Sequence, residues 1–168
     1  MKCLAGVHQP DAGEVVVDGN IVEIADVRAA EDLGIAFIHQ ELNLAENLDV
    51  GANVFLGREP RIFGPFFNRR EIRIQTQDLL RSLELQIAPD TRVRSLSIGH
   101  RQMVEIAKAL SQKARILIMD EPTSSLSLHE TRILFRLVNK LREEGMCIVF
   151  ISHRMAEVEQ IADRVIYL

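Results

Sequence analysis

Residues 116–121 read Ile-Leu-Ile-Met-Asp-Glu, so a continuous apolar run ends abruptly in two adjacent carboxylates. A run of this length and composition predicts a strand buried on both faces, as in a parallel sheet. Residues 147–151 and 164–168 have the same character, and stretches with helical spacing separate the three runs. Buried strands that alternate with helices predict an α/β fold with helices on both faces of the sheet.

The N-terminal part of the chain predicts smaller elements next to this sheet. Residues 14–24 are rich in β-branched side chains on either side of Asp18 and Gly19, a dipeptide that suits the tight turn of a hairpin. Residues 25–33 have helical composition, and residues 35–38 form another short apolar run that predicts a strand.

Both ends of the chain look interrupted. Residues 1–5 are apolar and are closed by Gly6, as the last turn of a helix would be, but they have no residue that could cap a beginning. The last predicted strand stops at residue 168 without a turn or a polar tail. We therefore expect a fold that is truncated at both ends.

The middle of the chain is helical and irregular. Glycines and prolines interrupt residues 43–70, which predicts a loop-rich region. Apolar residues recur at helical spacing farther along, which predicts helices over about 72–83, 98–110, 128–144 and 154–162. The third of these begins with a capping box, because Glu130 follows Ser127 at the required spacing.

Length and composition exclude several classes of protein. With 168 residues, 47% of them hydrophobic, the chain fits one globular domain. Twenty basic and 24 acidic residues give a net charge of −4, which disfavours a general nucleic-acid binder. Cys3 and Cys147 lie far apart in apolar stretches, which indicates buried free thiols in a reducing compartment. We also expect no membrane-spanning segment, since the apolar runs are far too short.

Reactive side chains follow the predicted strands. Gln40 comes after residues 35–38, Asp120 and Glu121 end the run at 116, and His153 follows the run at 147. Because ligands of open parallel sheets bind beyond the carboxyl ends of the strands, these groups should meet at one rim. An amide, two carboxylates and an imidazole suit a magnesium-bound anionic substrate and an activated water, which favours phosphoryl transfer.

The start of one predicted helix could also bind phosphate. Ser97 and Gly99 open the helix that carries Met103, and such a start offers free backbone N–H groups and a positive dipole end.

Five motifs at these positions resemble the ATP-binding cassettes of ABC transporters, in family order and at family-like spacing. They are Gln40 as the Q-loop, residues 96–100 as the signature motif, residues 116–121 as the Walker B strand, residues 124–127 as the D-loop and His153 as the H-switch. Residues 40–42, 53–60 and 102–110 look like the monosaccharide-importer branch, in which two cassettes are fused. Residues 120–127 and 151–154 look more like the first cassette.

The resemblance implies a fold and its division. We expect an α/β fold with a parallel-sheet core like that of P-loop NTPases and an inserted helical subdomain. Residues 1–42 and 111–168 would form the catalytic core, and residues of about 43–110 would form the helical subdomain with the signature motif.

The resemblance also implies a role for each site residue, with ATP and Mg²⁺ as cofactors. Asp120 would hold Mg²⁺ through water, Glu121 would polarise the attacking water, and His153 would contact the γ-phosphate. Gln40 would sense both the metal and the γ-phosphate.

The remaining contacts would be made across a pair of cassettes. The signature residues Ser97, Gly99 and His100 would reach the nucleotide held by a facing cassette, and Ser124 would belong to the D-loop beside it.

The sequence departs from the family pattern at three points. His100 replaces the usual glutamine of the signature, and Ser127 replaces an aspartate that often closes the D-loop. The chain also contains no Gly-x-x-x-x-Gly-Lys-[Ser/Thr] loop, whose backbone and lysine cradle the phosphates. We therefore expect these 168 residues alone to bind nucleotide weakly and to be inactive.

The partners follow from the same resemblance. We expect membrane permease subunits, a second cassette and, indirectly, a sugar-binding protein, with no nucleic acid. The protein would be cytoplasmic and peripheral on the cytoplasmic face of the inner membrane. Phenylalanines and arginines at 58–70 resemble a nucleic-acid surface; a packed loop that faces a partner protein is the favoured interpretation.

Two other functions stay open at this point. The chain could be a hydrolysis-dead cassette that acts as a dimerisation or regulatory module, although it keeps Gln40, Glu121 and His153. It could also be a cassette of the translation or DNA-repair kind, against which the importer-like residues 102–110 argue.

Overall fold

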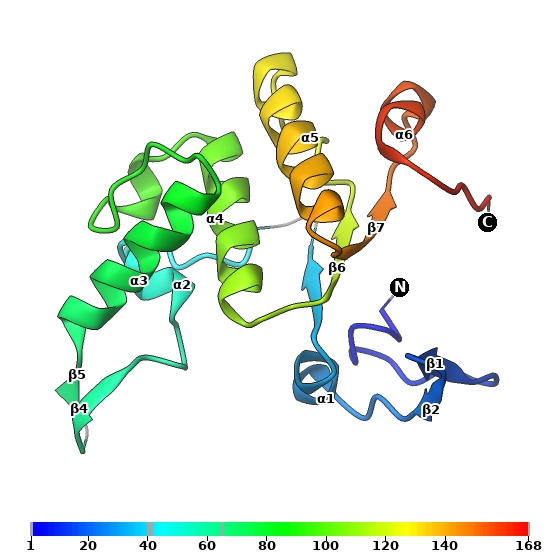
Figure 1. Cartoon of the computed structure of the whole chain (residues 1–168), viewed down its shortest axis with the longest axis horizontal. Coiled ribbons are helices and arrows are strands. Elements are labelled where there is room, and N and C mark those ends of the chain that lie inside the picture. The colour runs from blue at the N-terminus through cyan, green and yellow to red at the C-terminus, as the bar shows by residue number, and fades with distance from the viewer. Residues whose placement is uncertain (1, 40–41, 65, 168) are drawn as a thin grey trace.

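The computed structural model describes residues 2–39, 42–64 and 66–167. Its centre is a parallel sheet in the strand order β3 (Ile35–Ile38), β6 (Ile116–Asp120), β7 (Cys147–Ile151) (Figure 1). Ile116 of the middle strand pairs with Ile35 on one side and with Cys147 on the other. The parallel sheet expected from the apolar runs is confirmed. The carboxyl ends of its three described strands lie at the same edge.

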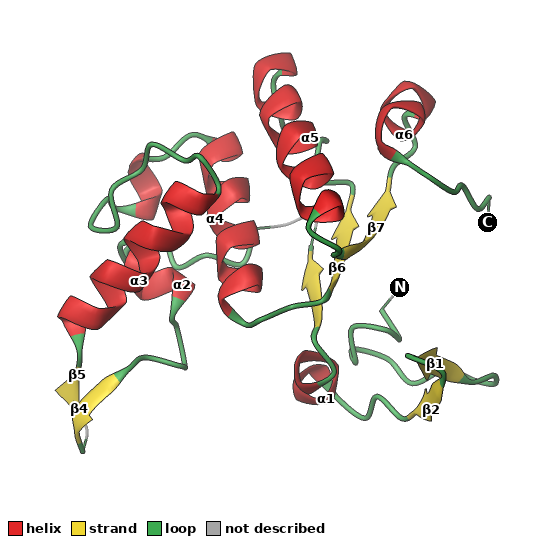
Figure 2. Ribbon diagram, viewed as in Figure 1, coloured by secondary structure: helices red, strands yellow, loops and turns green. Residues whose placement is uncertain are grey.

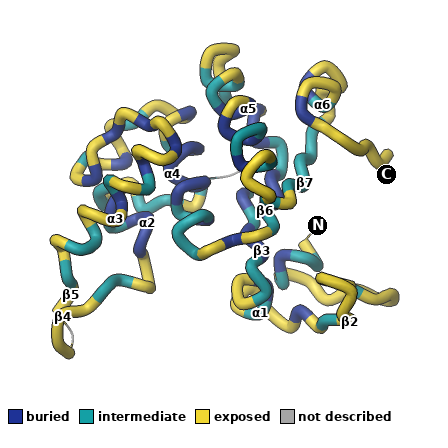
Figure 3. Tube along the Cα trace, in the orientation of Figure 1, coloured by how far each residue is buried: buried dark blue, intermediate teal, exposed yellow. Residues whose placement is uncertain are grey.

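Side chains of this sheet alternate between two apolar layers. Leu117 and Met119 of β6 belong to the larger core cluster, together with residues of α4 (Ile98–Ser111) and α5 (Leu128–Glu143). Ile118 faces the smaller cluster, which includes Ala30 of α1 (Val27–Asp32). All three β6 side chains are fully buried, as a strand covered on both faces must be. Figure 3 shows this buried centre between exposed outer surfaces.

The N-terminal hairpin has the expected form. β1 (Val15–Val17) pairs antiparallel with β2 (Asn20–Val22), and Asp18 and Gly19 between them both have positive φ angles, of 52° and 79°. Such a pair of left-handed residues is the requirement of a type I′ turn.

Residues 2–7 have the hydrogen bonds of a helix end, as expected. The N–H of Gly6 donates to the carbonyl of Cys3, and the N–H of Val7 donates to the carbonyl of Lys2. This pair of bonds is a Schellman motif. Gly6 has a φ of +69°, and a Cβ there would lie 2.1 Å from the carbonyl oxygen of Asp26, so only glycine fits.

The middle region contains the helix expected over about 72–83, and its loop-rich residues 43–70 are more ordered than the sequence indicated. Between residues 43 and 97 it contains α2 (Val50–Val54), β4 (Arg61–Phe63), β5 (Phe66–Phe67), α3 (Arg69–Ser82) and a short 3₁₀ turn, η1 (Val93–Ser95). Buried Asn53 holds the chain before α2, because its side chain exchanges hydrogen bonds with the backbone of Ala45. In Figure 2 the β4–β5 hairpin projects from the start of α3, away from the sheet.

The last strand predicted from the sequence is wrong. α6 (Met155–Ile161) ends as expected, but residues 163–167 form a bend and an irregular segment without strand pairing, and residue 168 lies outside the described part. Ile166 and Tyr167 are 71% and 77% exposed, and the described sheet ends at β7 with no neighbour for this segment. A strand without a partner cannot satisfy its backbone groups by pairing.

The expectation of a buried Cys147 is also wrong. This residue is a free thiol, but it is exposed at the start of β7, which is an edge strand of the described sheet. Cys3 is free and half-buried.

Candidate functional site

The carboxyl ends of β6 and β7 hold three of the residues expected at the rim. Asp120 is the last residue of β6, and Glu121 leaves the strand with a φ of +45°, an unusual backbone conformation for a residue with a side chain. The N–H of Glu121 donates to the carbonyl of Ile151 at 3.0 Å, which fixes this turn to the end of β7. Left-handed residues of this kind often occur at functional sites.

Glu121 and His153 contact one another directly. Nδ1 of His153 lies 3.0 Å from Oε1 of Glu121, although the two residues are 32 positions apart. The Glu121 side chain is 32% exposed and that of His153 is 66% exposed, so the pair is accessible to a ligand. Gln40, the third expected catalytic residue, lies outside the described residues.

A buried carboxylate that the sequence did not single out bonds to residues that neighbour this pair in the chain. Glu157 of α6 accepts a hydrogen bond from the Thr123 hydroxyl at 2.6 Å and one from the Ser152 hydroxyl at 3.2 Å. Its other oxygen binds the guanidinium of Arg154 at 3.1 Å. Glu157 thereby ties the turn after β6 to the turn after β7. The one signal available beforehand was an acidic residue in the first turn of a predicted helix.

Asp120 is the residue that could hold a metal ion at this rim. It is half-buried at the strand end, and no cluster of three or more His, Cys, Asp or Glu side chains suitable for a metal occurs among the described residues. A single carboxylate fits Mg²⁺, which keeps most of its waters and takes its other ligands from phosphate oxygens. The donor set would not suit a tightly coordinated structural metal such as Zn²⁺.

Ser97, Gly99 and His100 gather at the start of α4. Ser97 is the N-cap, and its Oγ accepts a hydrogen bond from the N–H of His100 at 3.3 Å. The same Oγ lies 3.3 Å from Nδ1 of His100. Ser97 and His100 are exposed, whereas Gly99 between them is buried.

Glu130 is a second residue whose full role the sequence did not indicate. It completes the predicted capping box with Ser127, but it also contacts the start of α4. Hydrogen bonds from the N–H and hydroxyl of Ser127, and then from Ser97 and Gly99, hold the pKa of Glu130 below its usual range. No sequence signal predicts a contact between Ser97 and Glu130, which are 33 residues apart.

The two groups of candidate residues lie at different places on the molecule. Glu121 and His153 belong to the ends of β6 and β7, whereas Ser97 and Gly99 are joined through Glu130 to the start of α5. Ser124 lies on the exposed turn that follows Glu121, and its N–H donates to the carbonyl of Glu121 at 3.1 Å.

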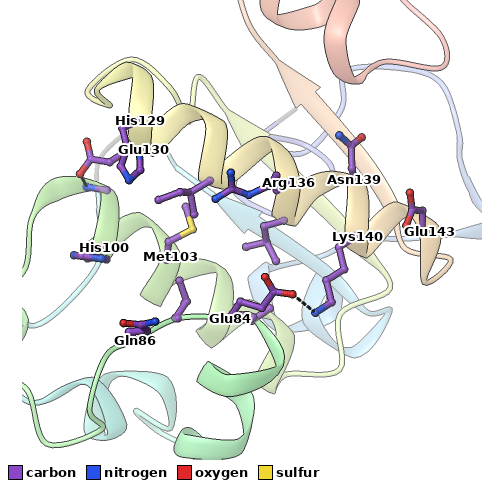
Figure 4. A pocket seen from close by; sticks show the side chains of 15 residues that line it. Glu84, Gln86, His100, Met103, His129, Glu130, Arg136, Asn139, Lys140 and Glu143 are labelled. Carbon is purple, nitrogen blue, oxygen red and sulfur yellow. Dashed lines mark hydrogen bonds and ion pairs between the residues drawn. The ribbon is translucent and has the colours of Figure 1, made fainter.

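A groove of about 750 Å³ adjoins the second group. It runs between α4, α5 and the segment after α3, and Figure 4 shows His100, Met103 and Glu130 along one part of it. At the other end Lys140 of α5 forms an ion pair with Glu84 at 3.6 Å. The groove borders the start of α4 and lies apart from the rim at β6.

The described helices differ in length and apolar character from a helix that crosses a bilayer. None of them, over residues 2–39, 42–64 and 66–167, combines enough length with enough apolar character to span a membrane.

The sequence profile of a known family matches most of the chain. The profile described as "ABC transporter" matches residues 1–124. A ribose import ATP-binding protein, RbsA, from Rhodopirellula baltica is 49% identical over 168 residues, which are 100% of this chain and 33% of that protein. A putative ribose/galactose/methyl galactoside import ATP-binding protein from Burkholderia cenocepacia is 52% identical over 166 residues, 98% of this chain and 32% of that protein.

Solved structures share the fold. A nucleotide-free ATP-binding cassette from an ABC transporter superposes with a TM-score of 0.80 at 22% identity, covering 96% of this chain and 68% of that one. A dimeric cassette in a post-hydrolysis state, bound to ADP and Pi, superposes with a TM-score of 0.73 at 24% identity, covering 95% and 70%. At these identities the likeness shows a common fold, which confirms the α/β core expected from the sequence.

Proposed function

Because this chain belongs to the ABC transporter family, we propose that it is an ATP-hydrolysing cassette of an importer for a monosaccharide. The chain spans about a third of the length of the curated relatives it matches, and their names concern import of ribose or galactose. The observation that carries the proposal is the contact between Glu121 and His153 at the carboxyl end of β6. A carboxylate and an imidazole at this place suit a water attack on a phosphate.

Each residue of the rim has a role in the proposed reaction. Glu121 accepts a proton from the attacking water and orients it, while His153 donates a hydrogen bond to the γ-phosphate. Because Nδ1 donates its proton to Glu121, a hydrogen bond donated from Nε2 to a phosphate oxygen requires the imidazolium, which carries a proton on both ring nitrogens. Gln40 is proposed to link the rim to the helical subdomain. Glu157 fixes the turn that carries Glu121 relative to the turn that carries His153.

Asp120 is the proposed magnesium residue and would hold the ion through water. When bound, Mg²⁺ neutralises charge that develops on the phosphate oxygens. The N–H of Glu121 is bonded to the carbonyl of Ile151, and in this proposal Asp120 serves the ion while Glu121 serves the water.

A second cassette is proposed to complete the site. Ser97, Gly99 and His100 lie at the start of α4, apart from Glu121 at the end of β6, which supports their binding a nucleotide held by a facing cassette. Ser124 lies on the turn that follows Glu121, as a D-loop residue would. The phosphate-binding loop with its lysine is not in these 168 residues, so hydrolysis requires a polypeptide that supplies it.

The helical subdomain, residues of about 43–110, is proposed to dock on a membrane permease. Its β4–β5 hairpin exposes Phe63 and Phe66, at 83% and 69%, on a projecting ribbon. Exposed aromatic side chains of this kind are typical of protein interfaces. The permease would place the cassette on the cytoplasmic face of the inner membrane and connect it to a sugar-binding protein. Nucleic acid is not a proposed partner.

The rival proposal, a hydrolysis-dead dimerisation module, is disfavoured by the geometry of the rim. Such a module has no need for Glu121 to be paired with His153, or for a buried Glu157 that joins the turns on which they lie. The test is the full-length polypeptide reconstituted with its permease in vesicles, with ATP turnover measured with and without the sugar-loaded binding protein. Sugar-dependent turnover supports the importer, and its complete absence supports the module.

A further inference from the structure

The carboxylate of Glu130 divides its two oxygens between two helix starts. Oε1 accepts hydrogen bonds from the hydroxyl of Ser97 at 2.9 Å and from the N–H of Gly99 at 3.2 Å. Oε2 accepts from the N–H of Ser127 at 3.0 Å and from its hydroxyl at 2.8 Å. Figure 4 shows Glu130 beside the start of α4, at the edge of the groove.

The donors on α4 are those that a phosphate at this helix start would use. A hydroxyl and a backbone N–H at the first turn of a 14-residue helix bind anions because no intrahelical acceptor satisfies them. Here a carboxylate of the chain itself satisfies them. The lowered pKa of Glu130 agrees with a carboxylate that is charged and stabilised by these bonds.

The backbone at Gly99 is shaped around this carboxylate. A Cβ at position 99 would lie 2.3 Å from Oε1 of Glu130 and 2.5 Å from its Cγ. The absence of a side chain therefore lets Glu130 reach the N–H of Gly99, as it would let a phosphate oxygen do so.

We propose that Glu130 is an internal competitor that sets the affinity of Ser97 and Gly99 for phosphate. This inference rests on the proposed function, in which these residues bind the nucleotide of a facing cassette. Phosphate and the Glu130 carboxylate cannot share the same two donors, and like charges at this distance repel. Glu130 must turn away from α4 before phosphate binds.

The surroundings of Glu130 allow this movement. The groove of about 750 Å³ lies directly beside its side chain, so the carboxylate has space to enter. Arg136 lines the same groove and offers a cation to a carboxylate that has left α4. The bonds to Ser127 lie on the other oxygen, so the same carboxylate joins the start of α5 to the start of α4.

The test measures binding of inorganic tripolyphosphate to the chain through the amide resonance of Gly99. Glu130→Gln keeps the size and the capping residue type but removes the charge. We expect it to lower the dissociation constant about fivefold or more, since one repulsive charge near the anion is lost. Glu143→Gln removes the same charge from another part of the groove and should leave the constant unchanged. Equal effects of both variants, or weaker binding to Glu130→Gln, overturn the proposal.

A measurement on the unaltered chain does not depend on any variant. Tripolyphosphate that displaces Glu130 must shift the side-chain carboxyl ¹³C resonance of this residue in step with the Gly99 amide. A carboxyl resonance that stays constant while Gly99 titrates, or a Gly99 amide that never responds, overturns the proposal. Both readouts are independent of ATP turnover, so failure of the importer proposal is recognised separately, by the absence of turnover in vesicles.

Discussion

Nδ1 of His153 lies 3.0 Å from Oε1 of Glu121, across the ends of two neighbouring parallel strands. The contact depends on Glu121 adopting a left-handed backbone conformation immediately after β6 and on its N–H binding the carbonyl of Ile151. The parallel pairing of β6 with β7 thus brings together two side chains that lie 32 residues apart in the sequence. This pair is the chemical centre of the proposed hydrolysis.

Replacing His153 should reduce turnover strongly. In the full-length polypeptide with its permease, His153→Ala removes both the partner of Glu121 and the proposed phosphate contact. We expect kcat to fall about 100-fold or more, the usual worth of a positioned acid or base. In a Glu121→Gln background the same change should cost little further, since the two residues act as a unit. The exposed His8 is the control, and equal losses in His8→Ala and His153→Ala would contradict the assignment.

The buried contact between Thr123 and Glu157 should contribute to stability. Thr123→Val keeps the shape of the side chain but removes the donor that lies 2.6 Å from the buried carboxylate. We expect the free energy of unfolding to fall by about 1–3 kcal/mol, the cost of leaving a buried acceptor with one bond fewer. Urea unfolding measures this change. The half-buried Thr131 offers a control, and a midpoint that moves no more than in Thr131→Val would contradict this role.

Stability should depend on pH through the buried Glu105. Burial raises the pKa of this carboxyl, while Lys108, the Asn43 backbone and His39 act in the opposite direction. A raised folded-state pKa means that the folded protein holds the proton more tightly, so its contribution to stability falls as pH rises above the ordinary carboxyl range. Glu105→Gln, which mimics the protonated form, should raise the free energy of unfolding at pH 7 by about 1 kcal/mol.

The comparison that decides this point is urea unfolding at pH 5 and pH 7. The advantage of Glu105→Gln over the unaltered chain should be larger at pH 7. An advantage that is larger at pH 5, or a destabilised variant at both values, would show that the carboxylate is favourably bound when charged.

The projecting hairpin should matter for docking and little for folding. Phe63→Ser combined with Phe66→Ser removes two largely exposed aromatic side chains, so the stability should change by less than about 0.5 kcal/mol per site. We expect association with permease-containing vesicles to weaken about tenfold, measured by co-sedimentation. Ile21 on the β1–β2 hairpin is 68% exposed and provides a matched apolar control. Equal binding of the double variant and Ile21→Ser would contradict docking through β4 and β5.

Local patterns predicted most of the elements, because each depends on neighbours in sequence. The apolar run of β6, the turn at Asp18 and the capping box of Ser127 are of this kind, and all three are confirmed. The strand predicted over residues 164–168 failed because pairing requires a neighbouring strand, which an apolar run cannot supply by itself.

The contacts of Glu157 and Glu130 could not be predicted from the sequence, for a different reason. Glu157 and Glu130 act through hydrogen bonds that span 34 and 33 residues, to Thr123 and Ser97. The spacing of residues along the chain does not predict such contacts, because they form only when the sheet and its helices pack. The reactive residues Asp120, Glu121 and His153 were predictable because they follow strands directly.

The most direct test of the central claim is the turnover of Glu121→Gln in the full-length polypeptide assembled with its permease. Glutamine keeps the size of the side chain but cannot accept the proton of the attacking water. We expect ATP hydrolysis to fall at least about 100-fold while binding of labelled ATP is retained, with Glu159→Gln on the exposed face of α6 unaffected. Undiminished hydrolysis by Glu121→Gln would contradict the catalytic role of this residue and, with it, the proposed mechanism.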